Sequence, residues 1–258
     1  MSNTQTIDQS QSGRSRAYER LTPESAVLLL IDHQSGLVSG VRDLEPDEVR
    51  HNVVAFARVA RLLRVPVVLT STAPMMWGPI LPELTEALPG VENIERSLVN
   101  AWNEPRVRDA VKRTGRQKLL IAGITTPVCL TFAAMSAAAD GYDVYALLDA
   151  SGTWSDLLRL TAIEQMRQAG VTITSGLAAF VEMLHDNASP IASEFYAALD
   201  LPATRYVLQI TQGASLPETG RTSRMASSSG GMSNRGDREI GNMSRLTTAG
   251  SGRPDGRR

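Results

Sequence analysis

Short apolar segments alternate with helix-like segments along most of this chain, and this alternation constrains its fold more than any other feature. The apolar segments are expected to be strands at residues 26–31, 65–70, 118–122, 143–148 and 171–174, with a short extended piece at Ile94. Helical spacing of apolar residues covers residues 46–64, 81–88, 105–113, 126–139, 155–169, 178–185 and 191–199. Strands that are apolar throughout and separated by helices indicate a mostly parallel sheet covered on both faces. The pattern therefore predicts a three-layer α/β/α domain.

The two ends of the chain differ from this pattern. Residues 1–20 are polar and rich in Ser and Gln, whereas residues 207–258 are rich in Ser, Gly, Arg and Thr. Segments of such composition cannot bury enough surface to offset their chain entropy. We therefore expect one folded domain at residues 21–206 between two disordered tails, with the arginines of the C-terminal tail exposed to solvent.

Charge and composition exclude several classes of protein. The net charge of −1 gives no reason to expect a nucleic-acid partner. No apolar run approaches the roughly 18 residues of a membrane helix, and the N-terminus has no apolar region typical of a secretory signal. A single cysteine cannot form an internal disulfide, which favours a reducing compartment. The expectation is a cytoplasmic protein that acts on a small molecule.

The single cysteine, Cys129, stands where a thiol becomes reactive. The strand at 118–122 is closed by Gly123, and helical spacing then resumes behind Thr126 and Pro127. Thr126 suits the N-cap and Pro127 the first helical position, so Cys129 falls in the first turn. The positive end of a helix stabilises a thiolate there. We therefore expect the pKa of Cys129 to lie below the roughly 8.5 of a free thiol.

Polar and aromatic side chains follow the other predicted strands. The carboxyl ends of parallel strands meet at one edge of a sheet, where open α/β sheets hold their active sites. That edge should gather a thiol, a carboxylate, a guanidinium and all three tryptophans. Besides Cys129, the candidates at this edge are Asp32, Gln34, Trp77, Arg96, Asn100, Trp102, Thr125 and Trp154.

Together these groups predict nucleophilic catalysis. Cys129 is the candidate nucleophile, and Asp32 is the candidate base that takes the thiol proton and passes it to a leaving amine. Backbone N–H groups of Thr125 and Cys129 could form an oxyanion hole. The candidate substrate pocket comprises Gln34, Trp77, Asn100, Trp102 and Trp154.

Three segments carry a resemblance to a known family. They are Leu-Leu-Ile-Asp32-His-Gln, the basic residue Arg96 ahead of a short aromatic loop, and Ala122-Gly-Ile-Thr-Thr-Pro-Val-Cys129. Residues 41–47, 100–102 and 149–153 support it. The chain resembles the isochorismatase-like cysteine hydrolases, and within them the YcaC-like branch, over residues 21–205.

The resemblance implies an isochorismatase-like, Rossmann-like fold and a triad of Cys129, Asp32 and Arg96. Most members have a lysine at the third position, but Arg96 stands there in this chain, and arginine can act only as a fixed cation. The implied reaction is hydrolysis of a small amide, or a related C–N bond, through a Cys thioester. The family also implies a cis peptide bond between Ile124 and Thr125, and a ring-type homo-oligomer such as an octamer.

Nicotinamidase-type members of the family bind a metal through Asp and His ligands. The histidines of this chain, His33, His51 and His185, lie in separate predicted elements. No ligand cluster is therefore expected, and we predict that the activity needs neither metal nor cofactor.

Several alternatives stay open on the sequence. Asp32 could serve only in a turn or helix cap, Arg96 could pair with Glu92 or Glu95, and the tryptophans could pack in the core or at a subunit interface. At the level of function, vinyl-ether hydrolysis would not need Cys129. A non-enzymatic oligomeric or redox-sensing protein would use Cys129 for reversible oxidation.

Overall fold

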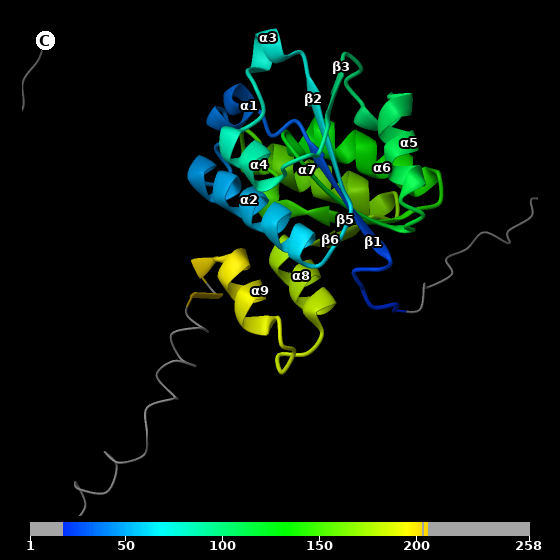
Figure 1. Cartoon of the computed structure of the whole chain (residues 1–258). Coiled ribbons are helices and arrows are strands. Elements are labelled where there is room, and N and C mark those ends of the chain that lie inside the picture. Colours follow the sequence, from blue (N-terminus) through cyan, green and yellow to red (C-terminus); the bar gives the residue numbers. More distant parts are fainter. Residues whose placement is uncertain (1–17, 203, 206–258) are drawn as a thin grey trace, which may run out of the picture. The chain divides into compact units, whose positions relative to one another are not determined.

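The computed structural model describes residues 18–202, 204 and 205. A sheet of parallel strands forms its centre, in the order β3-β2-β1-β4-β5-β6 (Figure 1). This arrangement confirms the predicted fold class. The strands are β1 (Ala26–Ile31), β2 (Val67–Thr72), β3 (Asn93–Arg96), β4 (Lys118–Gly123), β5 (Asp143–Leu147) and β6 (Thr172–Thr174).

Helices cover both faces of the sheet, as Figure 1 shows. One apolar core joins the sheet to α2, α4, α8 and α9, and a second core joins it to α5, α6 and α7. The short helices α1 and α3 follow β1 and β2. The bounds are α1 (Ser35–Ser39), α2 (Pro46–Leu62), α3 (Pro74–Trp77), α4 (Pro82–Ala87), α5 (Pro105–Arg113), α6 (Thr131–Ala139), α7 (Asp156–Gln168), α8 (Gly176–Leu184) and α9 (Ala192–Leu199).

Strand β1 lies in the middle of the sheet and serves both cores. Leu28 and Leu30 point into the first core, whereas Val27, Leu29 and Ile31 point into the second. All five side chains are fully buried. Burial of each large aliphatic side chain contributes about 1.5–3 kcal/mol. The well-anchored strand fixes the position of the residue that follows it at the sheet edge.

Strand β2 differs from its predicted bounds. It begins at Val67 because Pro66 has no N–H to donate, although the Pro66 carbonyl accepts a hydrogen bond from Leu28. It continues to Thr72, which pairs with Arg96 of β3. The chain then turns through Ala73, whose φ of 40° is left-handed, into the short helix α3. The apolar pattern does not reveal α3 because its side chains do not enter a core.

No helix in residues 18–202 has the length and apolar character needed to cross a membrane. The predicted tails lie largely outside the described residues, and the bounds of the predicted domain remain a prediction.

Candidate active site

The predicted nucleophile lies at the carboxyl end of the buried strand β4. The peptide bond between Ile124 and Thr125 is cis, as the family resemblance implied. One π-helical turn, Thr126–Leu130, leads into α6 and carries Cys129, whose residue is 8% exposed. Turns of this kind occur often at functional sites. The predicted continuous helix from Thr126 is therefore replaced by a π-helical turn followed by an α-helix.

The approach of this turn to the strand depends on Gly123. A methyl group on Gly123 would lie 3.2 Å from the backbone nitrogen of Leu130 and 3.2 Å from Cβ of Ile31. Its N–H donates to the Ser151 hydroxyl at 3.0 Å, and the N–H of Thr126 donates to the Gly152 carbonyl at 3.0 Å. The segment after β5 therefore supports the turn that holds Cys129.

The register between β1 and β4 places Asp32 at the same end of the sheet as the turn that carries Cys129. Ile31 of β1 pairs with Gly123 of β4, and the N–H of Ile124 donates to the Ile31 carbonyl at 3.1 Å. Asp32 follows Ile31 in a left-handed conformation with φ of 59°. Its backbone N–H donates to the Thr70 carbonyl at 2.9 Å. Asp32 is therefore fixed directly at the carboxyl edge of the central strands.

Arg96, the last residue of β3, reaches across β2 to Asp32. Its Nη2 lies 2.5 Å from Asp32 Oδ2, and neither side chain is exposed. Its Nη1 donates to the carbonyls of Leu98 and Val99. Loss of one partner of such a buried ion pair typically costs about 3–5 kcal/mol. The alternative in which Arg96 pairs with Glu92 or Glu95 is therefore wrong, because its charged end is committed to Asp32.

Asp32 has one oxygen paired with Arg96 and one oxygen without a hydrogen-bond partner among the described residues. The unpartnered oxygen is Oδ1, which is buried. Asp32 and the Cys129 thiol each shift the pKa of the other. Burial raises the pKa of Asp32 above its ordinary value, while the Arg96 charge and the thiol oppose that shift. The structure thus brings Cys129, Asp32 and Arg96 together.

The predicted low pKa of Cys129 is wrong for this structure. Burial of the thiol and the neighbouring negative charge of Asp32 raise its pKa above that of a free cysteine, and they outweigh the Thr125 backbone and the Arg96 charge. The sequence argument counted the helix end and the guanidinium but not desolvation. The resting site therefore holds a neutral thiol near Asp32.

Two of the predicted pocket residues, Gln34 and Asn100, are occupied by internal hydrogen bonds. Gln34 is fully buried and bonds to the backbones of Thr72 and Gly78. The Asn100 side chain donates to the Ser136 hydroxyl at 2.9 Å and accepts from the N–H of Trp102 at 3.0 Å. These side chains build the frame of the site, so the pocket role assigned to Gln34 and Asn100 is not supported.

The tryptophans divide into two groups. Trp102 is 2% exposed, donates from Nε1 to Asp140 at 2.8 Å and packs edge-on against Tyr142, as a core residue does. Trp77 in α3 and Trp154 after β5 are 36% and 49% exposed. Trp102 is therefore a core residue, whereas Trp77 and Trp154 are partly exposed at the surface.

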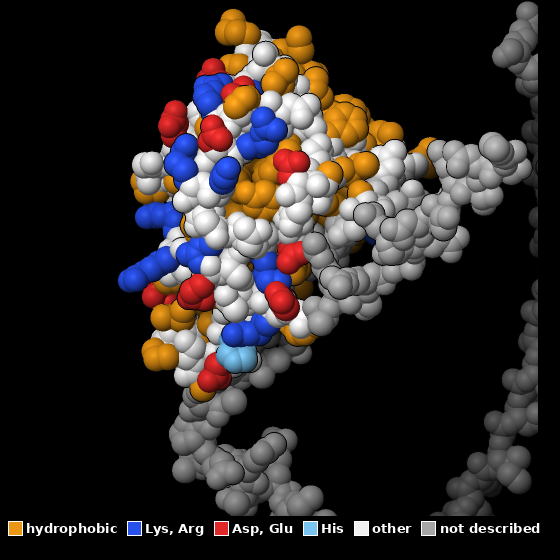
Figure 2. Space-filling model, turned by 90° about the vertical axis from the view of Figure 1, so that its right-hand side faces the viewer, with side chains coloured by type: hydrophobic (Ala, Val, Ile, Leu, Met, Phe, Trp, Pro, Cys, Tyr) orange, Lys and Arg blue, Asp and Glu red, His pale blue; other side chains and the backbone are white. Residues whose placement is uncertain are grey.

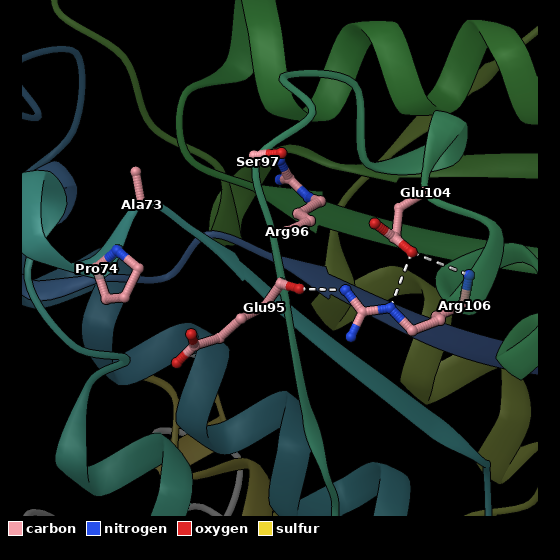
Figure 3. A pocket seen from close by; sticks show the side chains of 7 residues that line it. All are labelled: Ala73, Pro74, Glu95, Arg96, Ser97, Glu104 and Arg106. Carbon is pink, nitrogen blue, oxygen red and sulfur yellow. Dashed lines mark hydrogen bonds and ion pairs between the residues drawn. The ribbon is translucent and has the colours of Figure 1, made fainter.

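A cavity of about 460 Å³ adjoins the site (Figure 3). Figure 3 shows Ala73 and Pro74 on one side of β3 and Glu104 and Arg106 on the other. Arg106 donates to Glu104 at 2.9 Å, so this wall is already neutralised. The full lining is Ala73, Pro74, Glu95, Arg96, Ser97, Glu104 and Arg106. Only Arg96 connects this cavity to the candidate triad.

The described residues contain no group of three His, Cys, Asp or Glu side chains arranged to hold a metal. His33, next to Asp32, is fully buried, and its Nε2 lies 2.9 Å from the Ala150 carbonyl. Burial lowers the pKa of His33 to about 4, so the imidazole is neutral at physiological pH. Asp149 accepts hydrogen bonds from the N–H groups that begin α8, so its carboxylate has a structural role.

Sequence reasoning missed Ser151 as a support residue. Its hydroxyl accepts from Gly123 and donates to the Leu147 carbonyl at 2.7 Å, which ties the ends of β4 and β5 together. The carbonyls of Leu98 and Val99 that hold Arg96 were missed as well. No side-chain pattern in the sequence reveals these backbone contacts. The position of Ser151, shortly after an apolar strand, was a signal that the sequence did offer.

The parallel sheet with helices on both faces defines a protein of the α/β class, and its candidate site, Cys129, Asp32 and Arg96, lies at the carboxyl edge of the sheet. Residues 26–176 match the model of the isochorismatase domain. The chain belongs to the isochorismatase family and, as a YcaC-like member, is a hydrolase of that family.

Relatives and solved structures agree with this assignment. The chain is 39% identical to the probable hydrolase YcaC of Escherichia coli over 66% of this chain and 83% of the relative. The structure of YcaC from Pseudomonas aeruginosa, with hexane-2,5-diol and covalent acrylamide, has a TM-score of 0.71 and 38% identity over 77% of this chain and all of that one. The Escherichia coli YcaC structure, described as an octameric hydrolase of unknown specificity, has a TM-score of 0.73 and 36% identity over 78% of this chain and all of that one.

Proposed function

We propose that this protein is a cysteine hydrolase that cleaves a small amide, or a related C–N bond, through a thioester on Cys129. The observation that carries the proposal is the buried Asp32–Arg96 ion pair at the sheet edge where the turn of Cys129 follows the neighbouring strand. A neutral thiol is a weak nucleophile and needs an adjacent base. Asp32 is that base, and Arg96 is the fixed cation that keeps the carboxylate oriented.

The reaction begins with transfer of the thiol proton to Asp32. The sulfur then forms a bond to the amide carbonyl carbon, and the carbonyl electron pair moves to oxygen. When this pair returns, the C–N bond breaks and the amine leaves with the proton held by Asp32. Water, deprotonated by Asp32, attacks the thioester and releases the acid, after which the proton returns to sulfur. Backbone N–H groups of Thr125 and Cys129 are proposed to stabilise the oxyanion in both halves.

The raised pKa of Asp32 supports this double role. A base works best when its pKa lies near the operating pH, and burial moves the Asp32 pKa in that direction. Arg96 cannot give up its proton in a protein, so it does not compete as an acid or base. The covalent acrylamide in the Pseudomonas aeruginosa structure adds support, because acrylamide is an electrophile that reacts with thiolates.

The decisive test is intact-mass analysis of the protein with a library of small amides and esters. Wild-type protein should gain the mass of an acyl group, and Cys129→Ala should gain none. Turnover should fall by about 10³-fold or more in Cys129→Ala. Val128→Ala, in the same turn, is the matched control and should keep both acylation and turnover.

Two outcomes would replace the proposal with another function. Turnover that survives in Cys129→Ala but is lost in Asp32→Ala would select vinyl-ether hydrolysis. Absence of any acylation or turnover, together with reversible oxidation of Cys129 by dilute peroxide, would select a redox-sensing role.

We further propose that the chain forms a ring-type homo-oligomer. The related hydrolase from Escherichia coli is described as octameric. Hydrophobic side chains gather over the end of the molecule where Figure 1 places α3, as Figure 2 shows. The large hydrophobic side chains that are exposed along α3 and the segments after β3, β4 and β5 are Met75, Met76, Trp77, Leu98, Val99, Phe132, Trp154, Leu157, Leu158 and Leu160. Exposed apolar surface of this extent is typical of association surfaces.

A further inference from the structure

The ion pair between Asp32 and Arg96 leaves two buried polar atoms without a hydrogen-bond partner among the described residues. These atoms are Arg96 Nε, which is a donor, and Asp32 Oδ1, which is an acceptor. We propose that they hold one water molecule between them, and that this water is the nucleophile that hydrolyses the Cys129 thioester. This inference rests on the proposed function and gives Arg96 a second role, because Nε would hold the attacking water.

Two of the three nitrogens of the Arg96 guanidinium group already donate to the protein. Nη1 donates to the carbonyls of Leu98 and Val99, and Nη2 donates to Asp32 Oδ2. The guanidinium group is planar, so contacts at both of its ends also fix the direction of the Nε–H. The side chain is fully covered. Nε is therefore a donor held in a fixed direction inside the site.

The unpartnered donor and the unpartnered acceptor flank the same hydrogen bond. The N–H of Nε and one N–H of Nη2 point the same way in a guanidinium group, which is why a carboxylate can accept from both. In this structure Oδ2 accepts from Nη2 at 2.5 Å, but Oδ1 does not accept from Nε. Each of these two atoms is separated from that hydrogen bond by one carbon atom of its own group. A small molecule beside the bond can therefore reach both.

The chemistry of the two atoms specifies the ligand. A buried polar group without a partner is unfavourable, and folded proteins often satisfy such groups with ordered water. The ligand must accept from Nε and donate to Oδ1, and water does both through a single oxygen. Arg96 as a whole is 5% exposed and lines the cavity in Figure 3, so solvent reaches this residue while its guanidinium group stays covered.

A water held in this way is oriented for hydrolysis of a thioester. One O–H points to Asp32 Oδ1, which takes the proton, while a lone pair of the oxygen forms the bond to the acyl carbon. The C–S bond then breaks, the acid leaves, and the proton passes from Asp32 to sulfur. Arg96 keeps its own protons throughout. A lysine at this position would supply a charge but no second nitrogen beside the one that pairs with Asp32.

The test follows acylation and hydrolysis separately with p-nitrophenyl acetate. Attack by the Cys129 sulfur releases p-nitrophenolate in a burst, and the later steady rate reports hydrolysis of the acetyl thioester. Arg96→Lys should keep the burst but lower the steady rate by about 10–100-fold, because Nε is lost while a cation stays beside Asp32. Arg106→Lys, on the wall of the neighbouring cavity, is the matched control and should change neither. An unchanged steady rate in Arg96→Lys would contradict the inference.

Hydroxylamine distinguishes loss of the water from distortion of the thioester. It attacks the acetyl group with its own nitrogen and so does not need the water site. With hydroxylamine, the acetyl group should leave wild-type protein and Arg96→Lys at similar rates, measured from the mass of the whole protein. A general distortion around Cys129 would slow this release as well as hydrolysis, and that result would overturn the inference.

A high-resolution crystal structure of the wild-type protein gives a second measurement that does not depend on the folding of a variant. We expect a water at about 2.7–3.2 Å from both Arg96 Nε and Asp32 Oδ1. A direct bond between these two atoms, or no water on them, overturns the inference and leaves the cysteine mechanism intact. If wild-type Cys129 gains no acetyl group, the proposed function fails and the inference fails with it.

Discussion

At the scale of single residues, the proposed mechanism depends on one proton that Cys129 and Asp32 exchange. The Asp32 charge raises the pKa of the thiol, so its removal should lower that pKa. In Asp32→Asn we therefore expect iodoacetamide labelling of Cys129 to have its inflection at lower pH than in wild type. Amide hydrolysis should nevertheless fall by about 10²–10⁴-fold, because the base is lost. Labelling rates and turnover across pH measure both effects.

The control for this change is Asp43→Asn, which removes another buried carboxylate with an arginine partner, Arg159. It should leave the labelling inflection in place. If Asp32→Asn moves the inflection upward or leaves it unchanged, the two groups do not share a proton.

His33 should make the stability of the fold depend on pH. Its pKa is lowered from 6.5 to about 4 by burial, so between these values the unfolded chain binds a proton that the folded chain does not. The free energy of unfolding should therefore decrease as the pH falls from 6.5 to 4, by about 3 kcal/mol in total. The His33→Gln variant should lack this decrease. Urea unfolding at several pH values compares the two proteins, and parallel curves would contradict the argument.

At the scale of elements, the ends of β4 and β5 are held together through Ser151. In Ser151→Ala the Gly123 N–H and the Leu147 carbonyl lose their partner. The free energy of unfolding should drop by about 1–3 kcal/mol. Alkylation of Cys129 should become faster, because the loosened turn exposes the thiol.

Ser155→Ala serves as the comparison. The Ser155 hydroxyl caps the exposed start of α7. Its loss should weaken the helix end by about 0.5–2 kcal/mol without changing the alkylation rate of Cys129. A Ser151→Ala protein that is labelled at the wild-type rate would show that the turn does not depend on this serine.

The elements also show how far the sequence predicts this structure. Apolar runs such as 118–122 identify the parallel strands, because buried strands need side chains of one kind on both faces. Strand ends then place Asp32, Arg96 and Cys129 at one edge. The same logic places Trp102 at that edge but cannot say that its side chain turns inward to Asp140. A period of 3.6 residues likewise cannot distinguish the π-helical turn around Cys129 from an ordinary helix start.

The prediction of a lowered pKa for Cys129 failed for a physical reason. Position in a helix is readable from sequence, but desolvation depends on every side chain that packs around the sulfur. The pairing of Arg96 with Asp32 across an intervening strand was expected from the family pattern rather than from spacing. Local signals therefore predict which residues meet, and tertiary packing decides their protonation.

At the scale of the whole molecule, a substitution on the exposed face of α7 can test whether the chain forms the proposed oligomer. Leu157 is 70% exposed. Leu157→Glu should lower the mass of the assembly, measured by light scattering or native mass spectrometry, because a charge is costly in an apolar interface. Gln117→Glu lies just before the amino end of β4, away from α7, and should leave the mass of the assembly unchanged. A wild-type protein that sediments as a monomer would contradict the proposal.

Arg96 lies at the end of β3, the four-residue strand at one edge of the sheet, whereas Asp32 follows the central strand. Edge strands generally open at lower free energy than the core of a domain. The proposed activity is therefore tied to an edge of the sheet, where local opening is easier than at its centre. Mild denaturant or moderate heating should abolish the hydrolytic activity while tryptophan fluorescence and circular dichroism still report a folded protein. Inactivation and unfolding would then be two separate events, and storage conditions that protect one need not protect the other.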